Sequence, residues 1–180
     1  EVCGECHTNI YPEWKRSPHA NMMRDPTGVS VVGDFDGGSW MLPAEAKRPL
    51  LDEEPAARMY QRNGKYYMAL RHPVSNHYVP FEIKHVIGYQ YRQVYVTREA
   101  GGVLRRLPLQ WSTRRQEYFP YWNLQEGSTP TLEDLWQQMG SQNSAWNLYC
   151  ARCHTTNLQI LDKNAHHTRA DTRWVDDGIA

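Results

Sequence analysis

The amino-acid sequence predicts an α+β fold, in which helical N- and C-terminal segments flank a β-rich middle. Three observations support this prediction. Apolar residues at helical spacing, ended by a proline, occur near the N-terminus. Glycine turns separate runs of alternating apolar residues in the middle, and helix-capping signals return after residue 128. A chain of 180 residues favours one domain or two small ones.

The first 25 residues predict one short helix. Ile10 and Trp14 lie one helical turn apart, and Pro12 fits only in the first turn of such a helix. Pro18 ends the helix, because a proline ring cannot continue it. His19 follows at once, so we expect it on the turn after the helix.

Residues 26–56 are predicted to be mostly loop. The stretch 33–38 holds three glycines, and three prolines follow between residues 43 and 55. We interpret Gly37-Gly38 as a turn, because glycine and proline are the strongest interruptions of a helix or strand pattern.

The rest of the middle section, up to residue 128, is predicted to be β-rich. Asn63-Gly64 is a strong signal for a type I′ hairpin turn. A second hairpin is predicted to turn through Gly101-Gly102, and Val94 and Val96 alternate with Tyr95 as a half-buried strand requires. The predicted strands cover residues 57–61, 66–70, 90–97 and 103–107.

Two helices are predicted in the last third of the chain. Thr129 can cap a helix that begins at Pro130 and ends at Gly140. The second helix covers residues 144 to about 154. Its i, i+3, i+4 and i+7 positions share one helix face, and they are occupied by Trp146, Tyr149, Cys150 and Cys153.

Two copies of Cys-x-x-Cys-His carry the chemistry, at residues 3–7 and 150–154, and they use all four cysteines of the chain. This pentapeptide is the attachment signature of c-type haem, in which both thiols add to the porphyrin and the histidine binds its iron. The sequence therefore predicts two haem c (heme c) groups. The attachment residues are Cys3, Cys6, Cys150 and Cys153, and the proximal iron ligands are His7 and His154.

Two other uses of paired cysteines are weaker alternatives. A thioredoxin-like redox pair needs a βαβ setting, and nothing around Cys3 predicts one. A single zinc site of four cysteines would leave the histidine after each pair unexplained. It would also have to join segments more than 140 residues apart.

Each iron needs a sixth ligand or an open position. His19 is the best candidate, and Met22 and Met23 are its rivals; a methionine ligand would raise the reduction potential. His85 is the candidate for the second haem, although a histidine between apolar residues is also often an ordinary core residue. The weaker candidates are His72, His77, His166 and His167.

Arginines are candidates to pair with haem propionates, because the guanidinium fork matches a carboxylate. The sequence alone does not choose among them, and a solvated basic surface is the alternative. The candidates are Arg16, Arg92, Arg105, Arg106, Arg114 and Arg115.

Composition narrows the kinds of partner and cofactor that the protein can have. The chain has 20 Lys+Arg and 20 Asp+Glu, a balance that implies neither nucleic acid nor an acidic membrane surface as partner. No apolar run approaches the roughly 18 residues of a membrane span. The 7 Trp and 11 Tyr suit the wall of an apolar cofactor, and an ordinary aromatic core explains them equally well. Because aliphatic content is modest, we expect haem to dominate the core.

Several blocks of the chain resemble known cytochromes. The first motif with Trp14, Ser17 and His19 resembles the opening of multihaem c-type cytochromes in the broad group of the tetrahaem electron carrier of nitrifying bacteria. Three further blocks are similar to a periplasmic subfamily of that group. They are residues 85–95, 107–111 and 146–157.

This resemblance implies bis-histidine haems, electron transfer and a periplasmic or extracellular location in a bacterium or archaeon. It supports His7 and His154 as proximal ligands, His19 as a distal ligand and His85 as a second one. In the subfamily a segment like residues 172–179 leads into a third haem motif. We therefore expect either a natural two-haem form or a piece of a longer cytochrome. Because haem is normally attached to Cys-x-x-Cys-His outside the cytoplasm, we also expect that a signal peptide was removed before residue 1.

The sequence thus predicts one multihaem domain over residues 1–180, with haem segments at 1–25 and 129–180 around the middle at 26–128. The expected function is electron transfer, with other cytochromes as redox partners and strand edges available for docking or self-assembly. Two alternatives stay open. One is a nitrite- or hydroxylamine-type oxidoreductase with an open haem site, and the other is a subunit of an extracellular cytochrome polymer.

Overall fold

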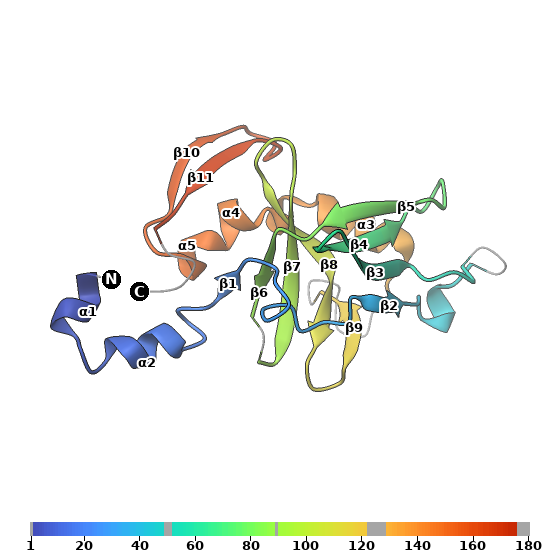
Figure 1. Cartoon of the computed structure of the whole chain (residues 1–180). Coiled ribbons are helices and arrows are strands. Elements are labelled where there is room, and N and C mark those ends of the chain that lie inside the picture. Colours follow the sequence, from blue (N-terminus) through green and yellow to red (C-terminus); the bar gives the residue numbers. More distant parts are fainter. Residues whose placement is uncertain (1, 49–51, 89, 122–128, 176–180) are drawn as a thin grey trace.

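A computed structural model describes residues 2–48, 52–88, 90–121 and 129–175, with the backbone alone described at residues 2 and 3. Its body consists of two antiparallel sheets, and the helices and a small hairpin lie around them (Figure 1). The α+β class predicted from the sequence is confirmed. None of the described helices is long and apolar enough to cross a membrane.

The five-stranded sheet has the order β1-β6-β7-β8-β9, and the four-stranded sheet has the order β2-β3-β4-β5. The strands of the first sheet are β1 (Met23–Arg24), β6 (His85–Ile87), β7 (Arg92–Arg98), β8 (Leu104–Ser112) and β9 (Glu117–Pro120). Those of the second are β2 (Asp36–Trp40), β3 (Ala57–Arg62), β4 (Lys65–Arg71) and β5 (Tyr78–Glu82).

The helices lie toward the chain ends. The N-terminal arm carries α1 (Val2–Cys6) and α2 (Tyr11–Arg16), and the C-terminal third carries α3 (Leu132–Gly140), α4 (Trp146–Tyr149) and α5 (Ala151–His154). Short 3₁₀ turns occur at Ala44–Ala46 and Gln142–Ser144. A final hairpin is formed by β10 (Gln159–Lys163) and β11 (Ala170–Arg173).

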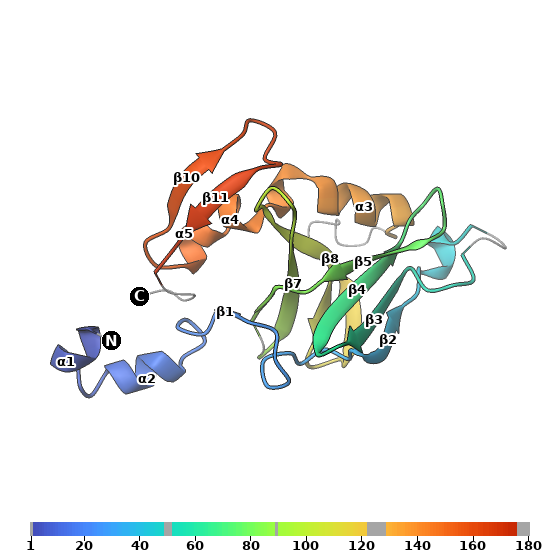
Figure 2. The ribbon, with the colours of Figure 1, turned by 45° about the horizontal axis from the view of Figure 1, so that its top comes forward.

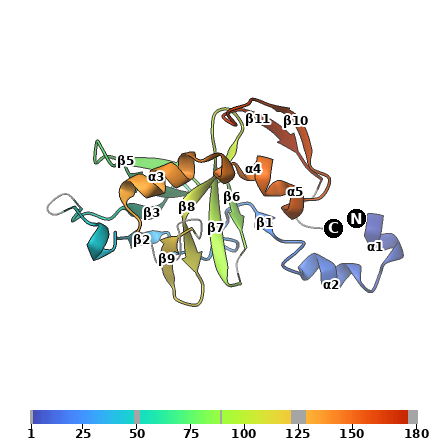
Figure 3. The same ribbon diagram turned by 180° about the vertical axis from the view of Figure 1, so that it is seen from behind.

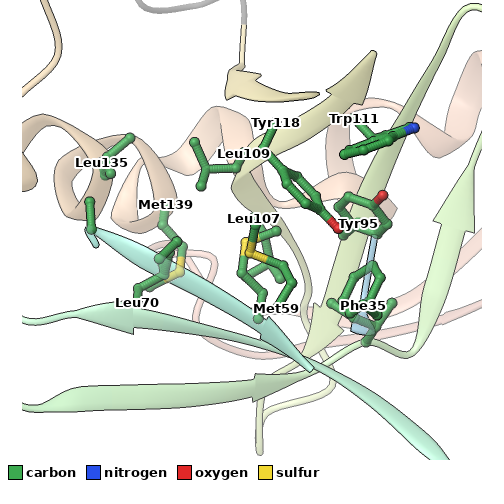
Figure 4. Packing of buried hydrophobic residues seen from close by; sticks show 14 of the residues in the cluster. Phe35, Met59, Leu70, Tyr95, Leu107, Leu109, Trp111, Tyr118, Leu135 and Met139 are labelled. Atoms are coloured by element: carbon green, nitrogen blue, oxygen red, sulfur yellow. The ribbon is translucent and has the colours of Figure 1, made fainter. Parts of the chain in front are cut away.

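The main core fills the space between the two sheets and α3 (Figure 4). Leu107 and Leu109 of β8 meet Met59 of β3, while Leu135 and Met139 of α3 close one end. At the other end Phe35 packs edge-on against Tyr95, at 5.1 Å between ring centroids. The β-rich middle therefore has a hydrophobic core of its own. Haem dominance, expected for the whole core, stays a prediction for the cysteine-bearing ends.

The Asn63-Gly64 hairpin is confirmed. Both residues have positive φ, as a type I′ turn requires, and Arg62 pairs with Lys65 across the turn. The second predicted hairpin is confirmed as well, because β7 pairs with β8 through Gly101-Gly102, although β8 continues to Ser112.

The loop prediction for residues 26–56 is wrong in part, because β2 pairs there with β3. Gly37-Gly38 lies inside that strand at an irregularity in the register, not at a turn between strands. Gly37 has φ +92°, and a Cβ on Gly38 would lie 2.2 Å from the Asp34 carbonyl oxygen. The two glycines thus permit a bulge that larger residues would not.

The predicted start of α3 is also wrong. Thr131, not Thr129, caps the helix: its side chain accepts the Asp134 N–H while the Asp134 carboxylate accepts the Thr131 N–H, a reciprocal capping box. The predicted end at Gly140 is confirmed.

The single helix predicted over residues 144–154 is divided into α4 and α5. The Cys153 N–H donates to the Cys150 carbonyl, an i→i+3 bond that tightens the chain between them. The C-terminal segment is helical only as far as His154, since the hairpin of β10 and β11 follows.

The five-stranded sheet has two different faces. Tyr95 and Leu107 point into the main core. Cross-strand pairing places Ile87, Val94 and Gln110 in one row, and His85, Val96 and Arg106 in the next. A second apolar cluster covers part of this outer face: Met23, Val96, Leu104, Trp146 and Ala151.

Candidate haem site

The two Cys-x-x-Cys-His motifs lie at the same end of the molecule, although they stand near opposite ends of the chain. Cys6 is the last residue of α1, and Cys153 and His154 belong to α5. Views from three directions place α1 and α5 at this end, beyond β1 and away from the four-stranded sheet (Figures 1, 2 and 3). The side chain of Cys3 lies outside the described residues.

Buried hydrogen bonds fix α4, and thereby the second motif, against the sheet. The Asn147 side chain accepts the Leu104 N–H at 3.0 Å and donates to the Thr172 hydroxyl at 2.8 Å. Asn147 and Trp146 are both almost fully buried. The position of Cys150, one residue beyond α4, is therefore set by contacts to both β8 and β11.

A pocket of about 340 Å³ opens beside the second motif on the outer face of the five-stranded sheet. This volume lies within the range of ligand sites, about 300–1,000 Å³. The wall is mostly apolar with a few polar groups. It is lined by Met22, Ile87, Gly88, Arg92, Val94, Arg106, Gln110, Tyr121, Trp146, Cys150 and His154.

Cys150 and His154 both face this pocket. Nδ1 of His154 is buried, and no hydrogen-bond partner for it occurs among the described residues. Burial lowers the pKa of His154, which favours the neutral imidazole that binds metals. Burial also raises the pKa of the Cys150 thiol, against the opposing charge of Arg106.

Arg106 and Gln110 supply polarity to a wall that is otherwise apolar. Arg106 is only 8% exposed; its Nη2 donates to the Asn143 carbonyl at 2.6 Å, and its guanidinium lies 4.3 Å from the Tyr121 ring centroid. Gln110 is fully buried and donates to the Pro120 carbonyl. Both Nε of Arg106 and Oε1 of Gln110 lack a hydrogen-bond partner in the described part of the chain.

The two methionines proposed as rival ligands are separated by the structure. Met22 lines the pocket, and its carbonyl accepts the Gly88 N–H at 2.9 Å. Met23 is 1% exposed and packs in the second apolar cluster instead. Only Met22 therefore shares a cavity with His154.

The structure does not bring His85 or His19 into this pocket. His85 shares the outer face, and its Nδ1 lies 3.5 Å from Asp25 Oδ1, but it is absent from the pocket wall. His19 is exposed on the turn after α2, as expected, and His7 is exposed too. The arm therefore presents its histidines to solvent.

The remaining candidates lie elsewhere. His72 packs edge-on against Trp136 at 5.0 Å between ring centroids, and His77 and His166 are exposed. His167 Nδ1 lies 2.9 Å from the Tyr149 hydroxyl. Tyr149 thus contacts the β10–β11 connection and is absent from the pocket wall. Trp146 and Cys150, which were predicted to share its helix face, do line the pocket.

The residues around the second motif fit a c-type haem. A half-buried thiol, a neutral histidine and an apolar wall with one buried cation meet at one cavity. Within the described ranges, no three His, Cys, Asp or Glu side chains gather as a metal cluster.

Comparisons with known proteins agree with this chemistry. Residues 2–29, which contain the first motif and His19, match the family described as cytochrome c554 and c-prime. The fold is similar to the crystal structure of the outer cell wall cytochrome OcwA, with a TM-score of 0.50 and 16% sequence identity. The family match supports a c-type cytochrome, and the structural likeness concerns the fold.

The likeness to OcwA spans 98% of this chain but only 29% of the OcwA chain, and at that identity it concerns the fold alone. No curated protein matches the sequence. The family match implies covalently bound haem c, and electron transfer is the activity that such cytochromes support.

Sequence reasoning missed the pocket wall, above all the choice of Arg106 among six arginines. The sequence of the strand is ambiguous on this point. Leu104, Arg106 and Gln110 are apolar, charged and polar, yet all residues of the strand up to Trp111 are buried. Only the pairing with Val94 and Val96 reveals which of them share a face.

Proposed function

We propose that this chain transfers electrons through two c-type haems outside the cytoplasm. Cys3 and Cys6 would hold one haem and Cys150 and Cys153 the other. The observation that carries the proposal is the second motif, whose thiol and histidine open onto an apolar pocket lined by Trp146 and a buried arginine.

When bound, each haem supplies a one-electron iron couple. The residues of the chain bind and orient it. His154 would hold the haem iron in the pocket and His7 would do so in the arm, while Ile87, Val94 and Trp146 of the pocket wall would exclude water. A low-dielectric wall of this kind limits solvent rearrangement around the iron and helps to set its potential.

The sixth ligands are part of the same proposal. His19 is assigned to a haem of the N-terminal end, because it follows the first motif on an exposed turn. His85 remains the histidine proposed for the second haem, since it stands on the same sheet face as the pocket.

We propose residues 1–180 as one multihaem domain in a periplasmic or extracellular cytochrome, or in a piece of a longer one. Because both motifs lie at one end, the four-stranded sheet stays available for contacts with other cytochromes or with copies of the chain. Its described edge strands are β2 and β5.

A second candidate function is an oxidoreductase with an open haem position. It is favoured by one observation: among the described residues His154 is the only histidine that lines the pocket. Met22, Arg106 and Tyr121 share that wall.

Absorption spectra separate the two functions. For a carrier we expect low-spin spectra from both haems and no carbon monoxide binding after reduction. A high-spin haem that binds carbon monoxide would contradict the carrier and favour the oxidoreductase. The His85→Ala variant assigns the ligand, because carbon monoxide should bind to it if His85 ligates the second iron. Exposed His77 gives a matched control as His77→Ala, which should leave the spectrum unchanged.

A further inference from the structure

We infer that Arg106 binds a propionate of the haem attached at Cys150 and Cys153, and that its charge raises the reduction potential of that haem. This inference rests on the proposed function. Arg106 lines the pocket together with Cys150 and His154, so its guanidinium shares the space that a haem at this motif would enter.

The first argument is charge balance. Arg106 is 92% buried, and a buried cation is costly unless an anion pairs with it. None of the described carboxylates forms an ion pair with it. The Asn143 carbonyl, which accepts a hydrogen bond from Nη2 of Arg106, and the face of the Tyr121 ring compensate the charge in part. Nε of Arg106 has no acceptor among the described residues.

The other strongly buried arginines differ on this point. Arg105 is 5% exposed and binds both carboxylate oxygens of Glu99, each at 2.9 Å. Arg71 is 2% exposed and lies 2.8 Å from Asp52 Oδ1. This protein thus pairs those two buried arginines with carboxylates, while Arg106 instead faces a cavity.

The second argument is the chemistry of the expected occupant. Haem is a flat apolar molecule that carries two carboxylates, and the pocket combines an apolar wall with one buried guanidinium. Arginine is the side chain best suited to bind a carboxylate with two parallel hydrogen bonds. Arg92 also lines this pocket but is exposed, so solvent screens its charge more strongly.

The sign of the electrostatic effect follows directly. Reduction adds one electron to the iron, and a nearby positive charge in a low-dielectric site stabilises the reduced form. Removing the charge must therefore lower the potential. Loss of the counter-ion of a propionate acts in the same direction, because it leaves a negative charge beside the iron.

The test is a potentiometric titration of the purified two-haem protein and its Arg106→Gln variant, followed by visible absorption. We expect the midpoint potential of one of the two redox waves to fall by at least about 59 mV, which for one electron is a tenfold change in the equilibrium constant of reduction. The other wave should stay in place. Arg106→Lys keeps the charge and should lie nearer the parent protein.

Arg62→Gln is the matched control. It removes the same unit of net charge, but Arg62 is exposed at the β3–β4 hairpin of the four-stranded sheet, so both waves should stay in place. Unchanged waves in Arg106→Gln, or equal shifts of both waves, would overturn the inference even if the variant is less stable. A parent protein without attached haem would instead overturn the proposed function.

Discussion

At the scale of single residues, the site divides into a part that follows from local sequence and a part that does not. The motif predicts the attachment cysteines and His154 from a fixed spacing along the chain, and Cys150 and His154 do line one pocket. Arg106 could not be chosen, because its role depends on strand register. In β8, one position decides whether an arginine binds Glu99, as Arg105 does, or faces the pocket.

Asp52 shows how a residue far from the pocket can control stability. Its carboxylate is almost fully buried, accepts two hydrogen bonds from the Arg48 side chain and lies 2.8 Å from Arg71. Hydrogen bonding from Arg48, ahead of the opposing effect of burial, holds the pKa of Asp52 well below its usual range. The ionised form is thus part of the folded state.

We expect Asp52→Asn to lower the free energy of unfolding by about 3 kcal/mol, because it leaves two guanidinium groups without their buried partner. Because the pKa of Asp52 is lower in the folded than in the unfolded protein, its ionised carboxylate stabilises the fold at pH values above about 3.9, the unfolded pKa. This contribution to stability is lost as the pH falls below that value. Denaturant unfolding at pH 7 and below pH 4 measures both effects. Exposed Glu53→Gln should cost little, and an equal loss in the two variants would contradict this reading.

At the scale of elements, prediction succeeded where the signal is local. Asn63-Gly64 specifies its turn by backbone preference alone, and Pro12 and Pro18 bound α2 for the same reason. It failed for β2, because that strand is defined by its pairing with β3 and passes through two glycines. The hairpin of β10 and β11 was not predicted either. Most residues of both strands are exposed, so apolar and polar residues alternate only weakly, and helix signals precede the hairpin in the chain.

Helix α3 offers a direct test of its corrected start. Thr131→Ala removes one half of the capping box and should cost about 1 kcal/mol of stability, measured by denaturant unfolding. Thr129→Ala is the matched control, because Thr129 is an exposed neighbour outside the helix. It should change stability by less than about 0.5 kcal/mol. The opposite ranking would restore the sequence-based start of the helix.

At the scale of the whole molecule, the main core lies apart from the two Cys-x-x-Cys-His motifs. The main core lies between the two sheets, where Leu107, Leu109 and Met59 meet (Figure 4). The haem motifs lie outside it at one end of the body (Figure 2). The predicted dominance of haem in the core came from the modest aliphatic content, which does not say where the aromatic rings lie. Rings such as Phe35 and Tyr95 belong to the main core, and Trp146 belongs to the pocket.

The most direct test of the central claim is the intact mass of the protein produced in a host that attaches c-type haem. We predict the mass of the polypeptide plus two haems. Replacing Cys150 and Cys153 by serine should remove one of them, and replacing Cys3 and Cys6 should remove the other. A native mass equal to that of the bare polypeptide, with all four thiols free to react, would contradict the proposal.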